Sequence, residues 1–490
     1  MSGVGSVPDA SIGRRGSPPP GLLIATLSAV ALTVAVLQTA VVPILGVISI
    51  QLQAAPVDVS WAVTANLLAA AASTPLIGRI ADLHTKKRVL LAVLVVVLAG
   101  SVLAATTASL PLLIVARVLQ GASFALYPIG ISILREELPA SRLMGAMAII
   151  SGVLGFGGGM GLVVTGLLMR GDADYHRVFW FTTAFSAAVI VAVAAVVPNR
   201  PRTGTGSVDW AGALGLAGGL TAILLAITQG SSWEWTSPQT LGCAAGGVAL
   251  LGLWWWWERR CAQPLVSTEM LTRRPILLTN LATVLVGMGL YCVFLGLTDY
   301  VQAPTAAGYG MGASVLYTSV VFLFPGALAG FLTALVSGRI ITRFGARRVL
   351  VTGAAIGVVG FVVLAVLEQA GWPAAVAGIL VNVYITLAYG ALPALVVGEV
   401  EPGETAVATS INAIARTVGG STAAALIAFL LTRTSATGYP PESSFTAIFA
   451  LGAVTGVAAM VLIAVSHPPL RRSESADDIA DSRAMNHEWG

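Results

Sequence analysis

The stretch GRIADLHTKKRVL, at residues 78–90, recurs 260 residues later as GRIITRFGARRVL, at residues 338–350. Six of the thirteen positions are identical, and each copy separates two long apolar runs. A polar stretch repeated at this distance in a chain of 490 residues indicates two similar halves. Duplicated halves are common in membrane proteins in which both halves enclose one site.

The composition is that of an integral membrane protein. Hydrophobic residues make up 56% of the chain and charged residues only 10%, whereas soluble domains carry roughly 25% charged residues. The net charge of +4 gives no indication of nucleic acid as a partner. Cysteine and histidine spacing suggests no disulfide framework and no metal site, and no catalytic cluster or nucleotide-binding loop stands out. We therefore expect no enzyme activity and no cofactor.

Fourteen apolar runs have the length of membrane spans, which need about 20 residues each. Only helices satisfy their own backbone at this length, so the predicted fold class is an all-α polytopic membrane protein. The runs lie near 22–46, 60–80, 88–107, 110–134, 143–169, 178–197, 210–228, 241–257, 275–298, 314–337, 347–367, 373–397, 405–431 and 444–465.

These runs predict two six-helix bundles separated by two inserted helices. The predicted divisions are a disordered cytoplasmic tail (1–21), an N-terminal bundle (22–200), two linker helices (201–265), a C-terminal bundle (266–466) and a second disordered cytoplasmic tail (467–490). With both termini inside, 21 of the 26 Lys and Arg residues fall on the cytoplasmic side. Such a bias predicts a multi-pass protein of the cytoplasmic membrane with both termini in the cytoplasm.

The repeated stretch resembles the loop motif of the major facilitator superfamily, in which a Gly precedes an acidic residue and a basic cluster. The resemblance covers roughly residues 20–466 and implies that superfamily's fold. The first copy has Asp82 as the acid, with Leu83 and Thr85 as departures; the second has Thr342 in place of the acid. The predicted cytoplasmic gate motif is Gly78, Asp82, Lys86, Lys87, Arg88, Gly338, Arg343, Gly345, Arg347 and Arg348.

Two interpretations of this motif stay open. The charges can lock the two bundles together on the cytoplasmic face, or they can serve only to orient the loops. Asp82 favours the first interpretation, because an acidic residue is not needed for orientation. We expect an unequal pair of latches in which Asp82 is the more important member.

The fourteen spans and the loop Trp233-Glu234-Trp235 resemble the fourteen-spanner drug:proton antiporters of this superfamily. Those proteins commonly carry an Asp in the first span, where this chain has Gln38. The fifth run is similar to the exporter motif of the family, although Leu162 stands in place of its Pro. Small residues let helices approach closely, so the predicted helix-packing motif is Gly157, Gly161 and Gly166.

Polar residues within the spans are the candidates for coupling and binding. Arg117 and Gln120 resemble an Arg-x-x-Gln-Gly motif of the family, and an Arg in a span costs roughly 2.5–3.5 kcal/mol on insertion scales. Arg117 is therefore either held by backbone carbonyls or tunes a neighbouring proton or substrate site. Acidic residues are almost absent, and Asp299 is either a proton carrier or a loop residue. The coupling candidates are Arg117, Gln120, Asp299, Asn412 and Arg416; the possible cavity lining is Gln38, Asn66, Tyr127, Asn280, Tyr291 and Asn382.

The sequence thus predicts a secondary active transporter that moves a small organic compound by alternating access. Proton-coupled efflux of a drug-like compound or metabolite is the favoured function. Uptake or uncoupled facilitation of a small solute is an alternative, and a membrane sensor or scaffold without transport is another. The expected partners are a small-molecule substrate, protons and the lipid bilayer, with no nucleic acid, and the protein is expected to be a monomer.

Overall fold

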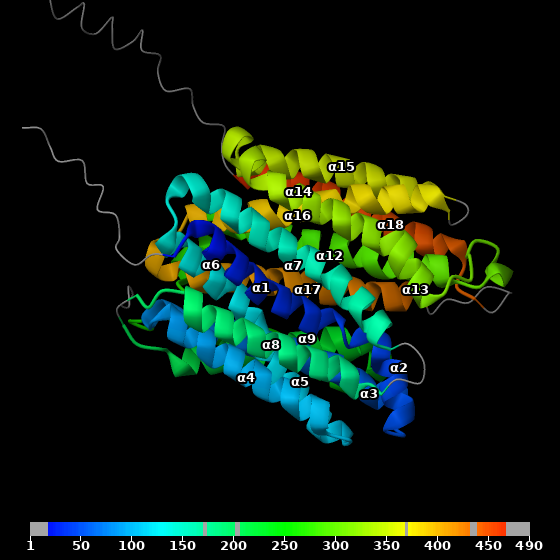
Figure 1. Ribbon diagram of the computed structural model, residues 1–490, viewed down its shortest axis with the longest axis horizontal. Coiled ribbons are helices and arrows are strands. Elements are labelled where there is room, and N and C mark those ends of the chain that lie inside the picture. The colour runs from blue at the N-terminus through cyan, green and yellow to red at the C-terminus, as the bar shows by residue number, and fades with distance from the viewer. Residues whose placement is uncertain (1–17, 170–173, 201–205, 368–370, 432–438, 467–490) are drawn as a thin grey trace, which may run out of the picture.

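The computed structural model describes residues 18–169, 174–200, 206–367, 371–431 and 439–466, and within these ranges every regular element is a helix (Figure 1). The long helices run back and forth along one direction (Figure 1). Most of the two predicted tails lies outside the described ranges, and Pro20 already begins the first helix.

The first six predicted spans are present as helices, two of which are interrupted. Their boundaries lie within a few residues of the apolar runs, because polar residues mark where each run leaves the bilayer. The elements are α1 (Pro20–Thr39), η1 (Val42–Ile44), α2 (Leu45–Gln51), α3 (Pro56–Leu83), α4 (Lys86–Thr106), α5 (Leu110–Gly121), η2 (Ala122–Ala125), α6 (Leu126–Glu137), α7 (Ala140–Leu168) and α8 (His176–Val196).

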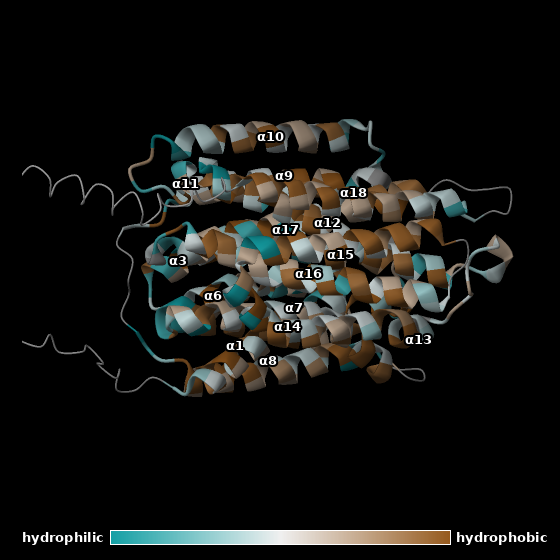
Figure 2. Ribbon diagram, turned by 90° about the horizontal axis from the view of Figure 1, so that it is seen from above, coloured by the Kyte–Doolittle hydropathy of each residue, from teal (hydrophilic) through white to brown (hydrophobic). Residues whose placement is uncertain are grey.

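The two inserted helices are α9 (Trp210–Trp233) and α10 (Pro238–Glu258), and α10 lies alongside α9 at the outer edge of the bundle (Figure 2). Of the described helices, thirteen are long and apolar enough to cross a membrane, and α10 is the predicted span that falls short. Its 21 residues are sufficient in length. Its glycines and the run Trp254 to Trp257 lower its hydropathy.

The last six predicted spans are also helices, again with one interruption. The fourth of them, α16, is the most buried of the candidate spans. The elements are α11 (Thr268–Thr272), α12 (Arg274–Gln302), η3 (Thr305–Ala307), α13 (Val315–Tyr317), η4 (Thr318–Leu323, a π-helical turn), α14 (Phe324–Phe344), α15 (Ala346–Val366), α16 (Trp372–Gly398), η5 (Pro402–Glu404), α17 (Thr405–Leu431) and α18 (Glu442–Ser466).

Glycines set how closely α7 packs on its neighbours. A Cβ on Gly157 would come within 2.5 Å of Leu32 in α1, and one on Gly161 would overlap Thr39. These two of the three predicted packing glycines therefore lie where α7 crosses α1. Nothing lies within 4 Å of a Cβ built on Gly166, so this third glycine of the motif makes no such contact.

The opposite side of α7 forms a seam with α14 of the other half. A Cβ on Gly152 would overlap Ala334, and one on Gly159 would lie 2.8 Å from the Ala327 Cβ. We call this line of contacts, which also includes Gly145 against Gly338, the α7–α14 seam. Because its residues are small, the two backbones approach closely along it.

Candidate functional site

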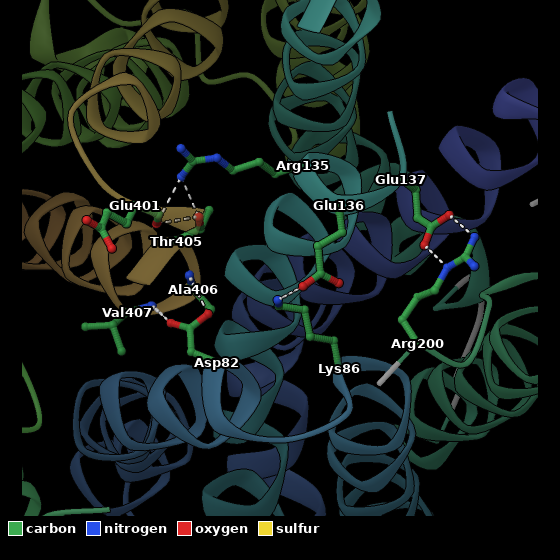
Figure 3. Close-up of polar contacts among 10 residues, drawn as sticks. All are labelled: Asp82, Lys86, Arg135, Glu136, Glu137, Arg200, Glu401, Thr405, Ala406 and Val407. Carbon is green, nitrogen blue, oxygen red and sulfur yellow. Dashed lines mark hydrogen bonds and ion pairs between the residues drawn. The ribbon is translucent and has the colours of Figure 1, made fainter. Parts of the chain in front are cut away.

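Asp82, in the last turn of α3, caps the first turn of α17 in the other half (Figure 3). Its Oδ1 accepts a 3.2 Å hydrogen bond from the backbone N–H of Ala406, and its Oδ2 accepts one of 2.9 Å from Val407. The first N–H groups of a helix lack acceptors within the helix, and the helix dipole favours a negative charge there. The Asp82 side chain is only 1% exposed, so this contact lies inside the interface between the halves.

Arg135, at the end of α6, makes a second set of contacts across the halves. Its guanidinium donates to the backbone carbonyl of Val400 at 2.7 Å, to that of Glu401 at 3.2 Å and to the Thr405 hydroxyl at 2.6 Å. Val400 and Glu401 lie in the connection between α16 and α17, and Thr405 is the first residue of α17. We call Asp82 and Arg135 together the latch, because both side chains join the N-terminal half to the start of α17 or to the connection before it.

Ion pairs within the N-terminal half hold the helix ends that carry the latch (Figure 3). Lys86, at the start of α4, pairs with Glu136 of α6. Glu137 receives two hydrogen bonds from the Arg200 guanidinium, of 2.7 and 3.0 Å. The hydrogen bond and the negative charge of Glu137 raise the pKa of Arg200. Arg135, Glu136 and Glu137 therefore point to three different partners from consecutive positions.

The first glycine of each repeated stretch lies where a helix crosses the other half. A Cβ on Gly78 of α3 would overlap the Ser410 hydroxyl in α17, and one on Gly338 of α14 would overlap the Gly145 backbone in α7. The repeat thus places a glycine at two equivalent crossings. Each crossing requires that glycine, because a larger residue would push the halves apart.

Within the described part of the chain, the second repeated stretch makes no contact equivalent to that of Asp82. Thr342 is exposed, and its hydroxyl donates to the Gly338 carbonyl of its own helix at 2.6 Å. The Arg343 guanidinium lies 5.3 Å from the centre of the Phe344 ring. Gly345 joins α14 to α15 with a φ of 84°, a conformation that favours glycine.

Other basic residues of the two stretches act within their own halves. Lys87 donates to the Ala194 carbonyl at the end of α8, at 2.8 Å. Arg347, its counterpart in the second stretch, donates to the Ala464 carbonyl at the end of α18. Basic groups are favourable at helix C-termini, where carbonyls lack partners. Arg88 and Arg348 are exposed.

A cavity of about 430 Å³ lies between the halves and is lined by both of them. Five of the six predicted lining residues border it, namely Gln38, Asn66, Tyr127, Tyr291 and Asn382. Asn280 does not, because its Oδ1 accepts a 2.9 Å hydrogen bond from Asn412 and turns toward α17. The interrupted helices contribute Val42, Phe124 and Phe322, as expected where helix breaks border a cavity.

The comparisons with known proteins agree with this architecture. A family model described as Major Facilitator Superfamily matches residues 27–424. The chain belongs to the Major Facilitator Superfamily. This family and the relatives below consist of transporters rather than enzymes.

Two curated relatives illustrate the range of the superfamily. The uridine/deoxyuridine transporter of Lactococcus lactis is 28% identical over 71% of this chain and 73% of its own. The tetracenomycin C resistance and export protein of Streptomyces glaucescens is 28% identical over 72% of this chain and 64% of its own. The chain spans about half, 48%, of the length of two uncharacterized transporters of Mycobacterium tuberculosis that it also matches.

One solved structure shows the superfamily fold directly. The human organic anion transporter MFSD10 superposes with a TM-score of 0.62 over 90% of this chain and 100% of its own, at 13% identity. At this identity the likeness concerns the fold alone. It agrees with the all-α fold predicted from the sequence.

Arg117 of this superfamily member is held by backbone carbonyls. Its Nε donates to the Ala62 carbonyl at 2.8 Å, and its Nη1 donates to the Leu37 carbonyl at 3.0 Å and to Gln120 at 2.6 Å. The Leu37 carbonyl is free for this contact because α1 ends at Thr39. Of the two interpretations left open by the sequence, the contacts favour the structural one.

The other coupling candidates fall in different places. Asn412 donates to Asn280 at 2.9 Å and to the Thr283 hydroxyl at 2.8 Å, which ties α17 to α12. Asp299 is exposed near the end of α12 and does not line the cavity. The position therefore gives no support to Asp299 as a proton carrier. Arg416 does line the cavity.

Sequence reasoning missed several residues of this site. Arg135, Glu136 and Glu137 stand together at the end of a span, directly before Pro139, and that cluster of charges was the available signal. Tyr389 is one of the neutral polar residues within the predicted spans; it lines the cavity, and the Arg416 guanidinium lies 4.7 Å from the centre of its ring.

Proposed function

We propose that this protein moves a small organic compound across the cytoplasmic membrane by alternating access. The observation that carries the proposal is the cavity between the halves together with the latch. The latch joins the two halves where α3 ends and α17 begins. A site enclosed by two similar halves, with separable contacts between them, is the arrangement that alternating access requires.

Each latch contact is strong enough to shift the balance between two conformations. A hydrogen bond to a charged group contributes about 1.5–3 kcal/mol, and two conformations of a protein commonly differ by a few kcal/mol. Breaking the contacts of Asp82 and Arg135 would free α17 from α3 and α6 and open the cavity toward the predicted cytoplasmic side. In this proposal the latch holds the cytoplasmic gate closed.

Efflux driven by the proton gradient is the favoured direction and coupling. It is supported by the resemblance to exporters such as the tetracenomycin C protein. The second candidate is uptake or uncoupled facilitation. Two observations favour it: the cavity lining contains no Asp or Glu, and another relative is named as a uridine/deoxyuridine transporter.

Transport by the full chain in proteoliposomes tests the proposal. A panel of anionic, neutral and cationic organic compounds is offered under a pH gradient of either sign, with protein-free liposomes as the control. Efflux by antiport predicts that a compound moves against the proton flow and that its addition dissipates the gradient. Uncoupled facilitation predicts equilibration with no effect on the gradient. Movement of no compound above the protein-free control would contradict transport altogether.

A further inference from the structure

Arg416 brings an uncompensated positive charge to the cavity. Among the described residues that line it, Arg117 and Arg416 are the two charged ones, and none is an Asp, Glu, Lys or His. Among the residues that the structure describes, no carboxylate forms an ion pair with Arg416. A guanidinium removed from water without a counter-ion is costly, so this position calls for an explanation.

The two arginines of the lining differ in what their guanidinium groups do. Arg117 is 1% exposed and donates to two backbone carbonyls and to Gln120, so its donors are occupied by protein. Arg416 is half-buried, and two aromatic rings accompany it. Its guanidinium lies 4.7 Å from the centre of the Tyr389 ring and 5.4 Å from that of Tyr127. Contact with ring faces stabilises a cation, and a guanidinium has five N–H donors, which is more than its hydrogen bond with Tyr127 takes up.

The backbone holds Arg416 in a fixed position. A Cβ on Gly287 of α12 would overlap the Arg416 carbonyl, and one on Gly419 would overlap the Val284 carbonyl. These two glycines bring α12 and α17 into close contact at Arg416 and one turn further along α17. The Tyr127 hydroxyl, in α6, forms a 2.7 Å hydrogen bond with the Ser151 hydroxyl of α7. The charge is therefore presented to the cavity from a rigid support, as a preorganised binding group would be.

The rest of the lining is mostly apolar and aromatic. Phe124, Phe156, Phe294 and Phe322 border the cavity, and neutral polar groups come from residues such as Gln38, Asn66, Tyr291 and Asn382. A volume of about 430 Å³ lies within the range for small organic ligands. One fixed cation in an apolar chamber is complementary to a molecule with an apolar body and one anionic group.

We propose that the cavity binds a small organic anion, with Arg416 as the counter-ion of its carboxylate or similar acidic group. Planar carboxylates match the guanidinium fork and receive two parallel hydrogen bonds from it. The bound anion would supply the negative charge that pairs with the Arg416 guanidinium. The inference rests on the proposed transport function and names the substrate class of that same cavity.

A series of isosteric probes tests the charge preference by binding, independently of transport. We would measure the affinity of the full chain in nanodiscs for 1-naphthylacetate, 1-naphthylacetamide and 2-(1-naphthyl)ethylamine by calorimetry. The naphthyl body is constant, and the charge changes from negative through neutral to positive. We expect the carboxylate to bind about tenfold or more tightly than the amide, and the amine to bind most weakly.

Two variants connect this preference to Arg416. Arg416→Gln should remove the preference for the carboxylate over the amide, and Arg416→Lys should retain a smaller preference. Arg259→Gln, at an exposed position outside the cavity and the repeated stretches, is the matched control and should bind like the wild type. If Arg416→Gln does not fold, the wild type and Arg416→Lys still report the preference.

Equal or weaker binding of the carboxylate by the wild type would overturn the inference, as would a preference that survives Arg416→Gln or binding of none of the probes. The outcome for transport is separate. Selective anion binding without movement of any compound would contradict the proposed function but leave the anion site. Transport of neutral or cationic compounds, with no preference for anions, would leave the function and contradict the anion site.

Discussion

The Asp82 carboxylate accepts a 2.9 Å hydrogen bond from the backbone N–H of Val407, which lies 325 residues further along the chain. With the second bond from Ala406, both carboxylate oxygens are used, and neither partner is a side chain. Most substitutions of α17 residues would leave these donors in place. The contact therefore depends on the charge and shape of Asp82 and not on a matching partner residue.

We predict that Asp82→Asn reduces transport at least about fivefold without removing the protein from the membrane. An amide can accept from one of the two N–H groups but not from both, and an unsatisfied buried donor costs about 1–3 kcal/mol. The measurement is uptake or release by proteoliposomes containing equal amounts of protein. Thr342→Ala is the matched control, because Thr342 occupies the equivalent position and its hydroxyl donates to carbonyls of its own helix.

A direct readout of the latch is the distance between the two halves. Spin labels at His84 and Glu401, both exposed at the predicted cytoplasmic end, would report it by electron paramagnetic resonance. Asp82→Asn should broaden the distance distribution toward larger values. Identical distributions in wild type and variant, with unchanged transport, would mean that Asp82 is not part of a latch.

A second prediction concerns Gly338 and Gly145, which touch each other but differ in how much space an added Cβ would have. A Cβ on Gly338 would overlap the Gly145 backbone, whereas a Cβ on Gly145 would lie 3.9 Å from the Gly338 Cα. We expect Gly338→Ala to cost about 1–3 kcal/mol of the packed conformation and Gly145→Ala to be nearly neutral. Thermal stability and transport of the two variants, compared side by side, measure the difference. A Gly338→Ala variant that is as stable as the wild type would show that the seam can separate at this point without cost.

Arg117 should behave as a structural residue. Arg117→Gln leaves the Leu37 and Ala62 carbonyls without their charged donor, and we expect it to destabilise the fold by about 2–4 kcal/mol. The melting temperature should fall, while protein that does fold keeps the charge preference of the cavity. Arg88→Gln, at an exposed position, is the control. A variant that melts like the wild type but loses the charge preference would instead give Arg117 a role in binding.

Gly345 is predicted to be required by its backbone conformation. Its φ of 84° and ψ of 144° lie in a region that only glycine adopts without strain. Gly345→Ala should therefore cost about 1–3 kcal/mol, visible as a lower melting temperature. Gly252→Ala in α10, where nothing lies within 4 Å of the added Cβ, should cause no loss. An unchanged melting temperature for Gly345→Ala would indicate that the loop adopts another conformation.

Much of the fold could be predicted from the sequence because hydropathy alone places a membrane helix. The predicted run at 143–169 corresponds to α7, and that at 405–431 has the bounds of α17. Hydropathy does not predict breaks inside a span: neither the end of α1 at Thr39 nor the π-helical turn η4 was foreseen. Such breaks depend on neighbouring helices that supply the missing hydrogen bonds.

The site was predicted less completely, because residue type does not determine which way a side chain faces. Asn66 and Asn280 are both asparagines within spans, yet Asn66 borders the cavity and Asn280 bonds to Asn412. The partners of Asp82 could not be predicted either, because they are backbone N–H groups that any sequence would offer. Tertiary packing decides both outcomes.

The glycines of the α7–α14 seam stand at 145, 152 and 159, a regular spacing of seven residues. This spacing is two turns of a helix, about 10 Å, so the contacts form a nearly straight line along the bundle. We expect that line to keep α7 and α14 in contact while α3 and α17 separate at the end that Asp82 holds. A bulky residue on the line would push the two halves apart along much of their length, whereas a change at Asp82 would act at one end of the bundle alone.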